Sequence, residues 1–416
     1  MRPLPPLLIG ATLLLAGCSD RERANPFDPL NPTTGGRPSG FMALAGNGEV
    51  RLFWDAATGD AFIGFQLFRR DPGETSYHAI TGVLSRMTTS FRDAPLANGS
   101  DYAYRLHFVF TTGPGTLAAE DVARPGTTLP WMIESGGTEL LRLTPDNRRI
   151  SERRAGFGST ADVAANPRNG DVWVADEGNG RVVIYQTGSG VTVSVPGFQL
   201  PTAVGVDPSN TTGWVCDASR GRVYHVQRDG QVFAASIGPL LQPVDAAVDP
   251  FTGYVWICEF AGGRVRLHDD IGVLQWTCAV AGPSRVAVDS VTHEGWVTSF
   301  EHGIVTRISP AGQVLGSFPS FVAPLGVAVD ATRGRIWIAD PYAGRVIALH
   351  RDGQEEFRLT GLTDAGELSV DAATGDAWVV LGSTGSVVRI SPAGTILRSQ
   401  GGFRYPFAIS VDPGGR

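Results

Sequence analysis

The 416-residue chain contains no lysine, so all 34 of its basic residues are arginine. Acidic residues outnumber basic ones and give a formal net charge of −7, which leaves no electrostatic case for binding nucleic acid. Cysteine is scarce, with four in the chain, and the sequences GxSxG, HExxH and CxxC do not occur. These absences remove the common hydrolase, metalloprotease and redox motifs from consideration.

Long apolar runs are also missing, because the stretch Leu7–Leu15 is too short to span a bilayer as a helix. It follows Arg2 and precedes small residues, which is typical of a secretory signal peptide. The sequence Leu-Ala-Gly-Cys ending at Cys18 resembles the bacterial lipobox, which implies that residues 1–17 are removed and Cys18 is lipidated. An ordinary signal peptide with a chance cysteine is the alternative. Ser19 resembles the signal that sorts lipoproteins to the outer membrane.

The next two segments differ in composition. Residues 18–38 are polar and rich in proline, asparagine and glycine, which predicts a flexible tether. Residues 39–125 alternate apolar and polar side chains in short runs broken by turn residues, which predicts an antiparallel β-sandwich. The stretches EVRLFWDA, with Trp54, and SFRDAPLANGSDYAYRL, with Tyr102, resemble a fibronectin type III domain. The resemblance implies a spacer or adhesive module with Trp54 in its core.

Tryptophan then returns at intervals of 40 to 42 residues, at Trp131, Trp173, Trp214, Trp256, Trp296, Trp337 and Trp378. A period of this length indicates a repeat architecture. Each repeat contains about four short strands, which bury their faces only by packing against neighbouring repeats. The spacing therefore predicts a seven-bladed β-propeller over residues 129–416 and an all-β fold for the chain.

The first repeat lacks the strand that begins the others, and residues 407–412 repeat the pattern of that missing strand. We therefore expect the C-terminal strand to complete the first blade and close the ring, which removes two exposed sheet edges. A typical repeat, LGVAVDATRGRIWIADPYAGRVIALHRDGQEE at 325–356, resembles NHL-type and streptogramin-lyase propellers. The resemblance implies the fold; its members include protein-binding modules, scaffolds, and metal-assisted lyases or hydrolases.

Polar residues that recur in most repeats are expected to belong to the scaffold. An acid ends the second strand of most repeats, and an arginine usually follows five residues later. This spacing predicts an ion pair that holds the intervening loop. The expected pairs are Asp176 with Arg181, Asp217 with Arg222, Glu259 with Arg264, and Asp340 with Arg345. The acid that ends the first strand, such as Asp330, precedes turn residues and predicts a turn cap rather than a metal ring.

Residues that depart from the repeat are candidates for a site. One position of the first strand is charged in four repeats and small in the other three. The charged residues are Asp162, Asp245, Arg285 and Glu367. Facing the axis, they would form a mixed-charge channel mouth that holds a polar ligand or a divalent cation such as calcium or magnesium. Solvated charges on the rim are the alternative.

The loops after the second strand depart in the same way, with aromatic residues at Phe260, Phe300 and Tyr342 where other repeats have small or polar ones. Together with Arg285 they predict a platform for a sugar, a peptide or an aromatic ligand. Glu301 and His302 follow Phe300 and offer acid–base or metal chemistry, or are ordinary surface residues.

These observations favour an exported, lipid-anchored protein of the cell envelope, in the outer membrane and facing either the periplasm or the surface. Its fibronectin-like domain would position a propeller that binds a protein or glycan partner, without catalysis and with no cofactor apart from the possible cation. Contact with the membrane is expected through the lipid alone. The alternative is a periplasmic lyase or hydrolase that uses a divalent ion at the channel mouth.

Overall fold

The computed structural model describes residues 25–412 and 414, so Cys18, Ser19 and the expected signal peptide lie outside the described part of the chain. The chain divides into two compact units. One includes Arg51–Arg92 and Asp101–Val122, and the other includes Leu44–Val50, Asp93–Ser100 and the chain from Ala123 onward.

Strands make up nearly all the regular structure of the described residues, which confirms the expected all-β fold. The exceptions are three short 3₁₀ helices, η1 (Glu177–Asn179), η2 (Phe300–His302) and η3 (Pro341–Ala343). Across the described ranges we find no helix with the length and apolar character needed to traverse a bilayer.

The N-terminal strands form two sheets, of order β1-β2-β6 and β4-β3-β7-β8, with β5 paired to β3. The strands are β1 (Met42–Ala45), β2 (Val50–Phe53), β3 (Phe62–Arg70), β4 (His78–Ala79), β5 (Leu84–Ser85), β6 (Ser90–Asp93), β7 (Tyr102–Phe110) and β8 (Gly113–Ala123). Trp54 is buried, with its ring centroid 5.6 Å from that of Phe65, as expected for a core residue. Phe27 lies in the expected tether but packs edge-on against Phe108, with centroids 4.8 Å apart.

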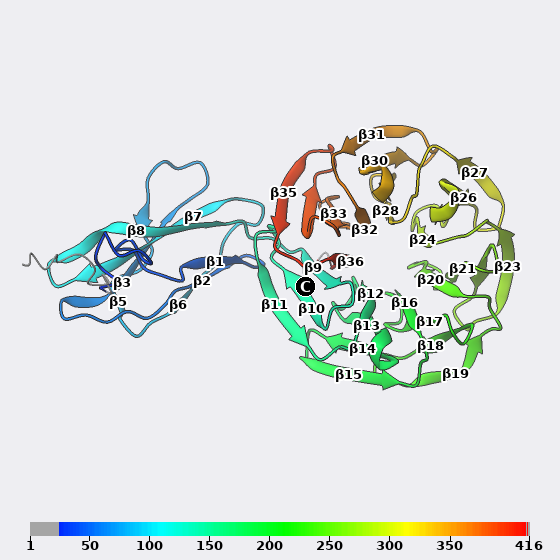
Figure 1. Ribbon diagram of the computed structural model, residues 1–416, viewed down its shortest axis with the longest axis horizontal. Coiled ribbons are helices and arrows are strands. Elements are labelled where there is room, and N and C mark those ends of the chain that lie inside the picture. Colours follow the sequence, from blue (N-terminus) through cyan, green and yellow to red (C-terminus); the bar gives the residue numbers. More distant parts are fainter. Residues whose placement is uncertain (1–24, 413, 415–416) are drawn as a thin grey trace, which may run out of the picture. The chain divides into compact units, whose positions relative to one another are not determined.

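The rest of the chain forms four-stranded antiparallel sheets arranged as a β-propeller (Figure 1). The first sheet has the order β11-β10-β9-β36 and the others follow the chain from β12 to β35, four strands at a time. Their strands are β9 (Leu129–Glu134), β10 (Glu139–Leu143), β11 (Ile150–Ala155); β12 (Thr160–Ala165), β13 (Val172–Asp176), β14 (Arg181–Gln186), β15 (Val191–Pro196); β16 (Pro201–Val206), β17 (Gly213–Asp217), β18 (Arg222–Val226), β19 (Val232–Ile237); β20 (Pro243–Val248), β21 (Val255–Glu259), β22 (Arg264–His268), β23 (Leu274–Ala279); β24 (Arg285–Val288), β25 (Gly295–Ser299), β26 (Ile304–Ile308), β27 (Val314–Phe318); β28 (Val327–Asp330), β29 (Arg335–Asp340), β30 (Arg345–His350), β31 (Glu355–Thr360); β32 (Ala365–Val370), β33 (Ala377–Leu381), β34 (Ser386–Ile390), β35 (Ile396–Gly401), and β36 (Pro406–Asp412).

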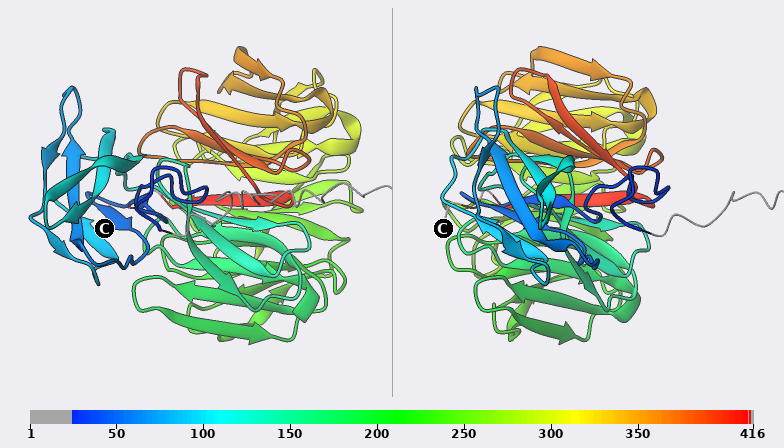
Figure 2. Two further views of the ribbon diagram at one scale, coloured as in Figure 1. Left: turned by 60° about the vertical axis from the view of Figure 1, so that its left-hand side comes forward. Right: turned by 90° about the vertical axis from the view of Figure 1, so that its left-hand side faces the viewer.

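We name the strands of each sheet a to d from the innermost to the outermost. Strands a, such as β12, β16, β20 and β36, surround the axis of the ring, and strands d, such as β15, β19 and β23, form its circumference (Figure 1). Seen from the side, the strands of the ring run between two faces at which the loops gather (Figure 2).

The repeated tryptophans occupy strand b of each sheet, and each is at most 1% exposed. They fill the layers between adjacent sheets. Trp173, for example, clusters with Val204 and Val215 of the next sheet. The packing is so close that a Cβ added to Gly213 would lie 2.8 Å from the Trp173 ring. The hydrophobic layers between sheets therefore hold the ring together.

The C-terminal strand completes the first sheet. Strand β36 pairs antiparallel with β9 in a register that runs from Pro406 opposite Glu134 to Asp412 opposite Leu129. The pairing joins strands that are more than 250 residues apart in sequence. This pairing is the one expected from the sequence, and it leaves neither end of the ring as a free inner edge.

Candidate functional site

The register of the strands decides which loops share a face of the ring. Thr160, the first residue of β12, pairs with Asp176, the last residue of β13. The loop that enters strand a therefore lies beside the loop that joins strands b and c. We call this end of the propeller the b–c face, and the end that carries the a–b turns the a–b face.

The four charged residues that depart from the repeat line one cavity on the ring axis. Asp162, Asp245, Arg285 and Glu367 border a space of about 330 Å³, together with apolar residues of strands a. Each lies near the start of its strand a, and therefore close to the b–c face. All four side chains remain partly accessible to solvent.

Arg285 is the single cation among these four groups, and it is already engaged. Its Nε donates to a carboxylate oxygen of Glu367, which lies two strands a farther round the ring, and its Nη1 donates to the Ser284 carbonyl at 3.1 Å. Burial alone would lower the pKa of Arg285, but the negative charges of Glu367, Asp245 and Asp162 outweigh it and hold that pKa above its usual range.

The two aspartates serve the backbone of neighbouring sheets. Asp162 accepts hydrogen bonds from the Val163 and Val204 amides, each at 2.8 Å, and Asp245 accepts one from Val286 at 2.7 Å. Loss of hydration in the narrow channel raises the pKa of Asp162 to about 6 and that of Asp245 to about 7, although Arg285 opposes both shifts. Both carboxyl groups therefore keep their protons to a higher pH than an ordinary aspartate does, and Asp245 does so more than Asp162.

The channel carboxylates do not converge as metal ligands. Among the described residues, the one group of three or more potential ligand side chains within 4.8 Å of one another is Asp71, Glu74 and His78, on the turn between β3 and β4. There, Arg69 forms a 2.6 Å ion pair with Asp71. In the channel, the Glu367 carboxylate is already paired with the guanidinium of Arg285. A metal ion bound to Glu367 would have to compete with that arginine.

The expected aromatic residues gather on the b–c face. The rings of Phe300 and Tyr342 meet edge to face with their centroids 5.3 Å apart, and Tyr342 is 74% exposed. Phe260 and His302 flank the loop between β23 and β24, where a Cβ added to Gly282 would lie 3.8 Å and 3.0 Å from them. The structure therefore brings these four side chains onto neighbouring loops; Glu301 is exposed beside them.

A short chain of contacts links these loops to the channel. The Phe300 amide donates to Ser284 Oγ at 3.1 Å, and the Ser284 carbonyl accepts the hydrogen bond from Arg285. The backbone of the aromatic loop is thus fixed to the residue that precedes the channel arginine.

Sequence reasoning missed Tyr405, which extends the aromatic surface. Its hydroxyl donates to Asp364 at 2.7 Å, and this hydrogen bond raises the pKa of Tyr405. The residue is 41% exposed and precedes strand a of the first sheet. Ser159 and Leu200 occupy the same position before their own strands a, so aligning these loops would have identified Tyr405 as a departure.

The expected ion pairs at the ends of strands b form in three of four sheets. Arg181 and Arg345 donate to Asp176 and Asp340, and Arg264 donates both Nε and Nη2 to Glu259 at 3.0 Å. The pairing of Asp217 with Arg222 was a wrong prediction. Asp217 instead accepts the Gln199 and Leu200 amides at 2.8 and 3.1 Å, while Arg222 bonds to Ser236.

The reason lies in a role that these acids share. Asp176 also accepts the Gly158 amide, and Asp340 the Ala323 amide, so each acid caps the loop that enters strand a. The acid at the end of strand b accepts these loop amides whether or not it also pairs with an arginine, as Asp217 shows. An arginine five residues later therefore does not guarantee an ion pair. The acids after strands a also cap their turns, as the sequence predicted. Asp249, for example, accepts a hydrogen bond from the Phe251 amide at 2.9 Å.

Comparison with known proteins supports the propeller. The model of the NHL repeat matches residues 159–185, which form part of the second sheet. No curated protein matches the sequence. Among solved structures, the virginiamycin B lyase of Staphylococcus aureus is 15% identical with a TM-score of 0.51, over 58% of this chain and 84% of the lyase.

Two further solved structures have the same kind of similarity. A functionally unknown protein from Desulfotomaculum acetoxidans is 13% identical with a TM-score of 0.58, over 68% of this chain and 98% of its own. The hydrazine synthase of Kuenenia stuttgartiensis is 11% identical with a TM-score of 0.54, over 61% of this chain and 90% of its own. At these identities the similarity is one of fold alone. The chain contains an NHL repeat and has a β-propeller fold similar to that of the streptogramin B lyases.

Proposed function

We propose that the protein is a non-enzymatic binding or scaffold protein whose b–c face binds a protein or glycan partner. The observation that carries this proposal is the edge-to-face pair of Phe300 with Tyr342, in which Tyr342 leaves 74% of its surface in solvent. Exposed tyrosines with one polar end are typical of interface anchors, because their rings bury a large area at low entropic cost.

The surroundings of this pair suit a large polar partner. Phe260 and Tyr405 lie on further loops of the same face, and the channel below presents carboxylates and the Arg285–Glu367 pair. An aromatic rim around polar groups can stack on sugar rings or on peptide side chains while the charges orient the ligand. The fit to a peptide or glycan is therefore better than to a small apolar molecule.

The proposal includes the setting of this face. We propose that the four-stranded sheets are the seven blades expected from the seven tryptophans, and that the N-terminal sheets are a fibronectin type III-like spacer. We further propose that Cys18 carries a lipid, through which the exported protein is held at the outer membrane as a component of the envelope. The lipobox-like sequence before Cys18 supports the anchor, and the buried Trp54 supports the sandwich.

The alternative function, a lyase or hydrolase that depends on a divalent ion, has less support. It requires carboxylates that converge on one ion, and the channel carboxylates instead cap backbone amides or pair with Arg285. Calcium or magnesium in the channel remains a proposal for this alternative. A rise in melting temperature on adding either ion, lost in Asp245→Ala, would favour it.

The binding proposal is tested by asking whether substitutions on the b–c face abolish the capture of one partner. Purified full-length protein, with Phe300→Ala and Tyr342→Ala variants, is used to capture partners from envelope extract. The matched control is Phe251→Ala, because Phe251 is 80% exposed but lies in an a–b turn at the opposite face. We expect the same protein or glycan to be captured by the wild type and by the Phe251 variant, and lost with the other two. Equal capture by all four would contradict the proposal.

A further inference from the structure

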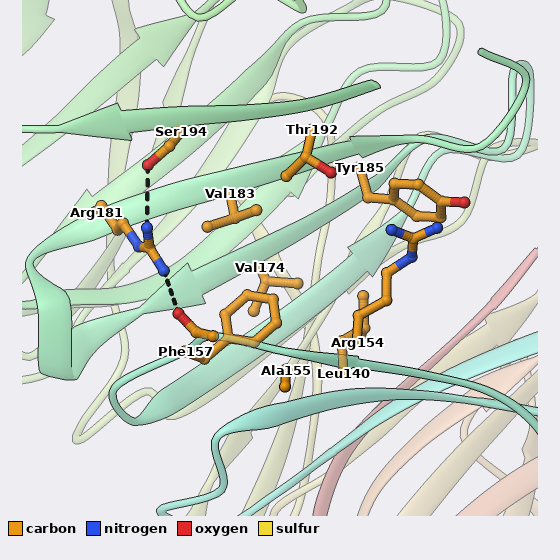
Figure 3. A pocket seen from close by; sticks show the side chains of 11 residues that line it. Leu140, Arg154, Ala155, Phe157, Val174, Arg181, Val183, Tyr185, Thr192 and Ser194 are labelled. Carbon is orange, nitrogen blue, oxygen red and sulfur yellow. Dashed lines mark hydrogen bonds between the residues drawn. The ribbon is translucent and has the colours of Figure 1, made fainter. Parts of the chain in front are cut away.

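A second cavity lies in the wall of the ring, between the first two sheets (Figure 3). It has a volume of about 250 Å³ and lies between β10 and β11 of the first sheet and β13 to β15 of the second. Its floor is apolar, since Leu140, Val174 and Val183 line it and are buried. It is separate from the channel and from the b–c face aromatics, because it shares no lining residue with either.

The repeat shows why a cavity exists at this place. In each sheet, one residue of strand d pairs with the second residue of strand c. In most sheets that residue is apolar and helps fill the space beside the next sheet. The residues are Val195, Ile237, Cys278, Phe318, Leu359, and Gln400 in the last sheet. In the first sheet it is Arg154, opposite Leu140. The first sheet therefore replaces a space-filling side chain with a charged one.

Arg154 does not fill the space but borders it. Its guanidinium lies over the ring of Tyr185, 3.3 Å from the centroid, and its Nη2 is 2.7 Å from Glu152. Glu152 also forms an ion pair with Arg142 at 3.2 Å, so two guanidinium groups share one carboxylate. The cluster of Arg142, Glu152 and Arg154 therefore has a net charge of +1. The Nε atom of Arg154 is buried and has no hydrogen-bond partner among the described residues.

The other end of the cavity is lined by Arg181, whose guanidinium already has partners within the protein. Arg181 donates two hydrogen bonds here, to the Gly156 carbonyl at 2.5 Å and to Ser194 at 3.4 Å (Figure 3). It also forms an ion pair with Asp176. Thr192 stands on the same side of β15 as Ser194, opposite Tyr185 in the register. The cavity thus has an apolar floor, hydroxyl groups on one wall, and at one end the partly exposed guanidinium group of Arg154.

We propose that this cavity binds a small apolar carboxylate, with the apolar body on the Leu140–Val174–Val183 floor and the carboxylate at Arg154. Anions are the natural partners of a partly exposed guanidinium in a cluster that has excess positive charge. The volume accommodates a group of the size of a phenylalanine side chain. The ligand is either a free acid or the C-terminal carboxylate of a peptide, which share this chemistry.

The test compares ligands that differ in one group. N-acetyl-phenylalanine, its amide, and phenylacetate are titrated into the full-length protein, with binding followed by ligand-observed NMR. We expect N-acetyl-phenylalanine to bind at least about tenfold more tightly than its amide, because the neutral amide carbonyl can accept the hydrogen bond but lacks the negative charge that strengthens it. Binding of phenylacetate as tightly as the amino acid would assign the site to free acids, and weaker binding would assign it to peptide C-termini.

Two variants locate the effect. Arg154→Gln should weaken acid binding about tenfold. Arg153→Gln should leave it unchanged, because Arg153 is exposed on the same strand and pairs with Glu139 at 2.9 Å. Thr192→Trp, at an exposed rim position, should block the cavity without touching the core. Equal affinity for acid and amide, equal loss in both arginine variants, or no binding at about ten millimolar ligand would overturn the proposal.

Discussion

Asp162 on β12 accepts a hydrogen bond through Oδ2 from the backbone N–H of Val204 on β16, at 2.8 Å. The same relationship joins Asp245 to Val286, so a channel carboxylate of one sheet satisfies an inner-strand amide of the next. Ser410 does the same for the Ala165 amide at 2.9 Å. The polar residues of the channel therefore connect neighbouring sheets through hydrogen bonds.

Asp162→Ala should destabilise the protein by about 1–3 kcal/mol, because it leaves the Val204 and Val163 amides without their acceptor. Asp162→Asn keeps one carbonyl acceptor and should lie between the alanine variant and the wild type. Urea unfolding followed by tryptophan fluorescence measures both. Wild-type stability of the alanine variant would show that the hydrogen bond between sheets contributes nothing.

Asp245→Asn should change how stability depends on pH. The pKa of Asp245 is raised from 3.8 to about 7 by burial, so the folded protein binds this proton more tightly than the unfolded chain does. Its contribution to stability is therefore full below about pH 4 and is lost as the pH rises to about 7. Because the group is partly exposed, we expect the asparagine variant to be more stable than wild type at pH 8 by on the order of 1 kcal/mol.

The comparison at pH 4 is the internal control, since the wild-type carboxyl group is then largely protonated and resembles the amide. Melting temperatures of both proteins across pH 4–8 provide the measurement. Parallel curves for the two proteins would mean that Asp245 titrates at its ordinary pKa.

Arg285→Leu should cost about 3 kcal/mol, because it leaves Glu367 and the two aspartates in the channel without a cation. Adding Glu367→Leu to this variant should restore much of the loss, since the uncompensated charge is removed. A double-mutant cycle from chemical denaturation gives the coupling between the two residues. A coupling energy near zero would contradict the ion pair.

Removal of β36 should open the ring. A chain that ends before residue 403 loses the pairing of Pro406–Asp412 with β9 and the buried side chains of Ala408, Ile409 and Val411. We expect a lower melting temperature and rapid proteolysis within 129–155, whereas a chain that ends after Asp412 should resemble the full-length protein. Wild-type protease resistance in the shorter chain would refute ring closure by this strand.

The sequence predicted most of the propeller because its regularities repeat. The tryptophans recur at a fixed period because each one packs between two adjacent sheets. Residues 407–412 have the pattern of a first strand, and the first repeat is the one that lacks such a strand. Loops were less predictable, because side-chain partners there depend on the backbone path. Asp217 illustrates this: its carboxylate is used by two loop amides, and Arg222 turns to Ser236.

The candidate site divides in the same way. Departures from the repeat located the four channel charges and the aromatic residues of the b–c face. They did not indicate that Asp162 and Asp245 would cap amides of the next sheet, because that role depends on the spacing between adjacent strands a. The sequence patterns of strands b and c also gave no sign of the cavity between the first two sheets. That cavity becomes apparent only when the register shows that Arg154 of strand d lies opposite Leu140.

Site-specific photo-cross-linking tests the central claim, that the b–c face binds a partner, most directly. A photoreactive phenylalanine analogue is placed at position 342 in one protein and at position 251 in another, and each is irradiated in cells of the producing organism. We expect a discrete adduct from position 342 and none of that mass from position 251. No adduct from position 342, or the same adducts from both faces, would contradict it.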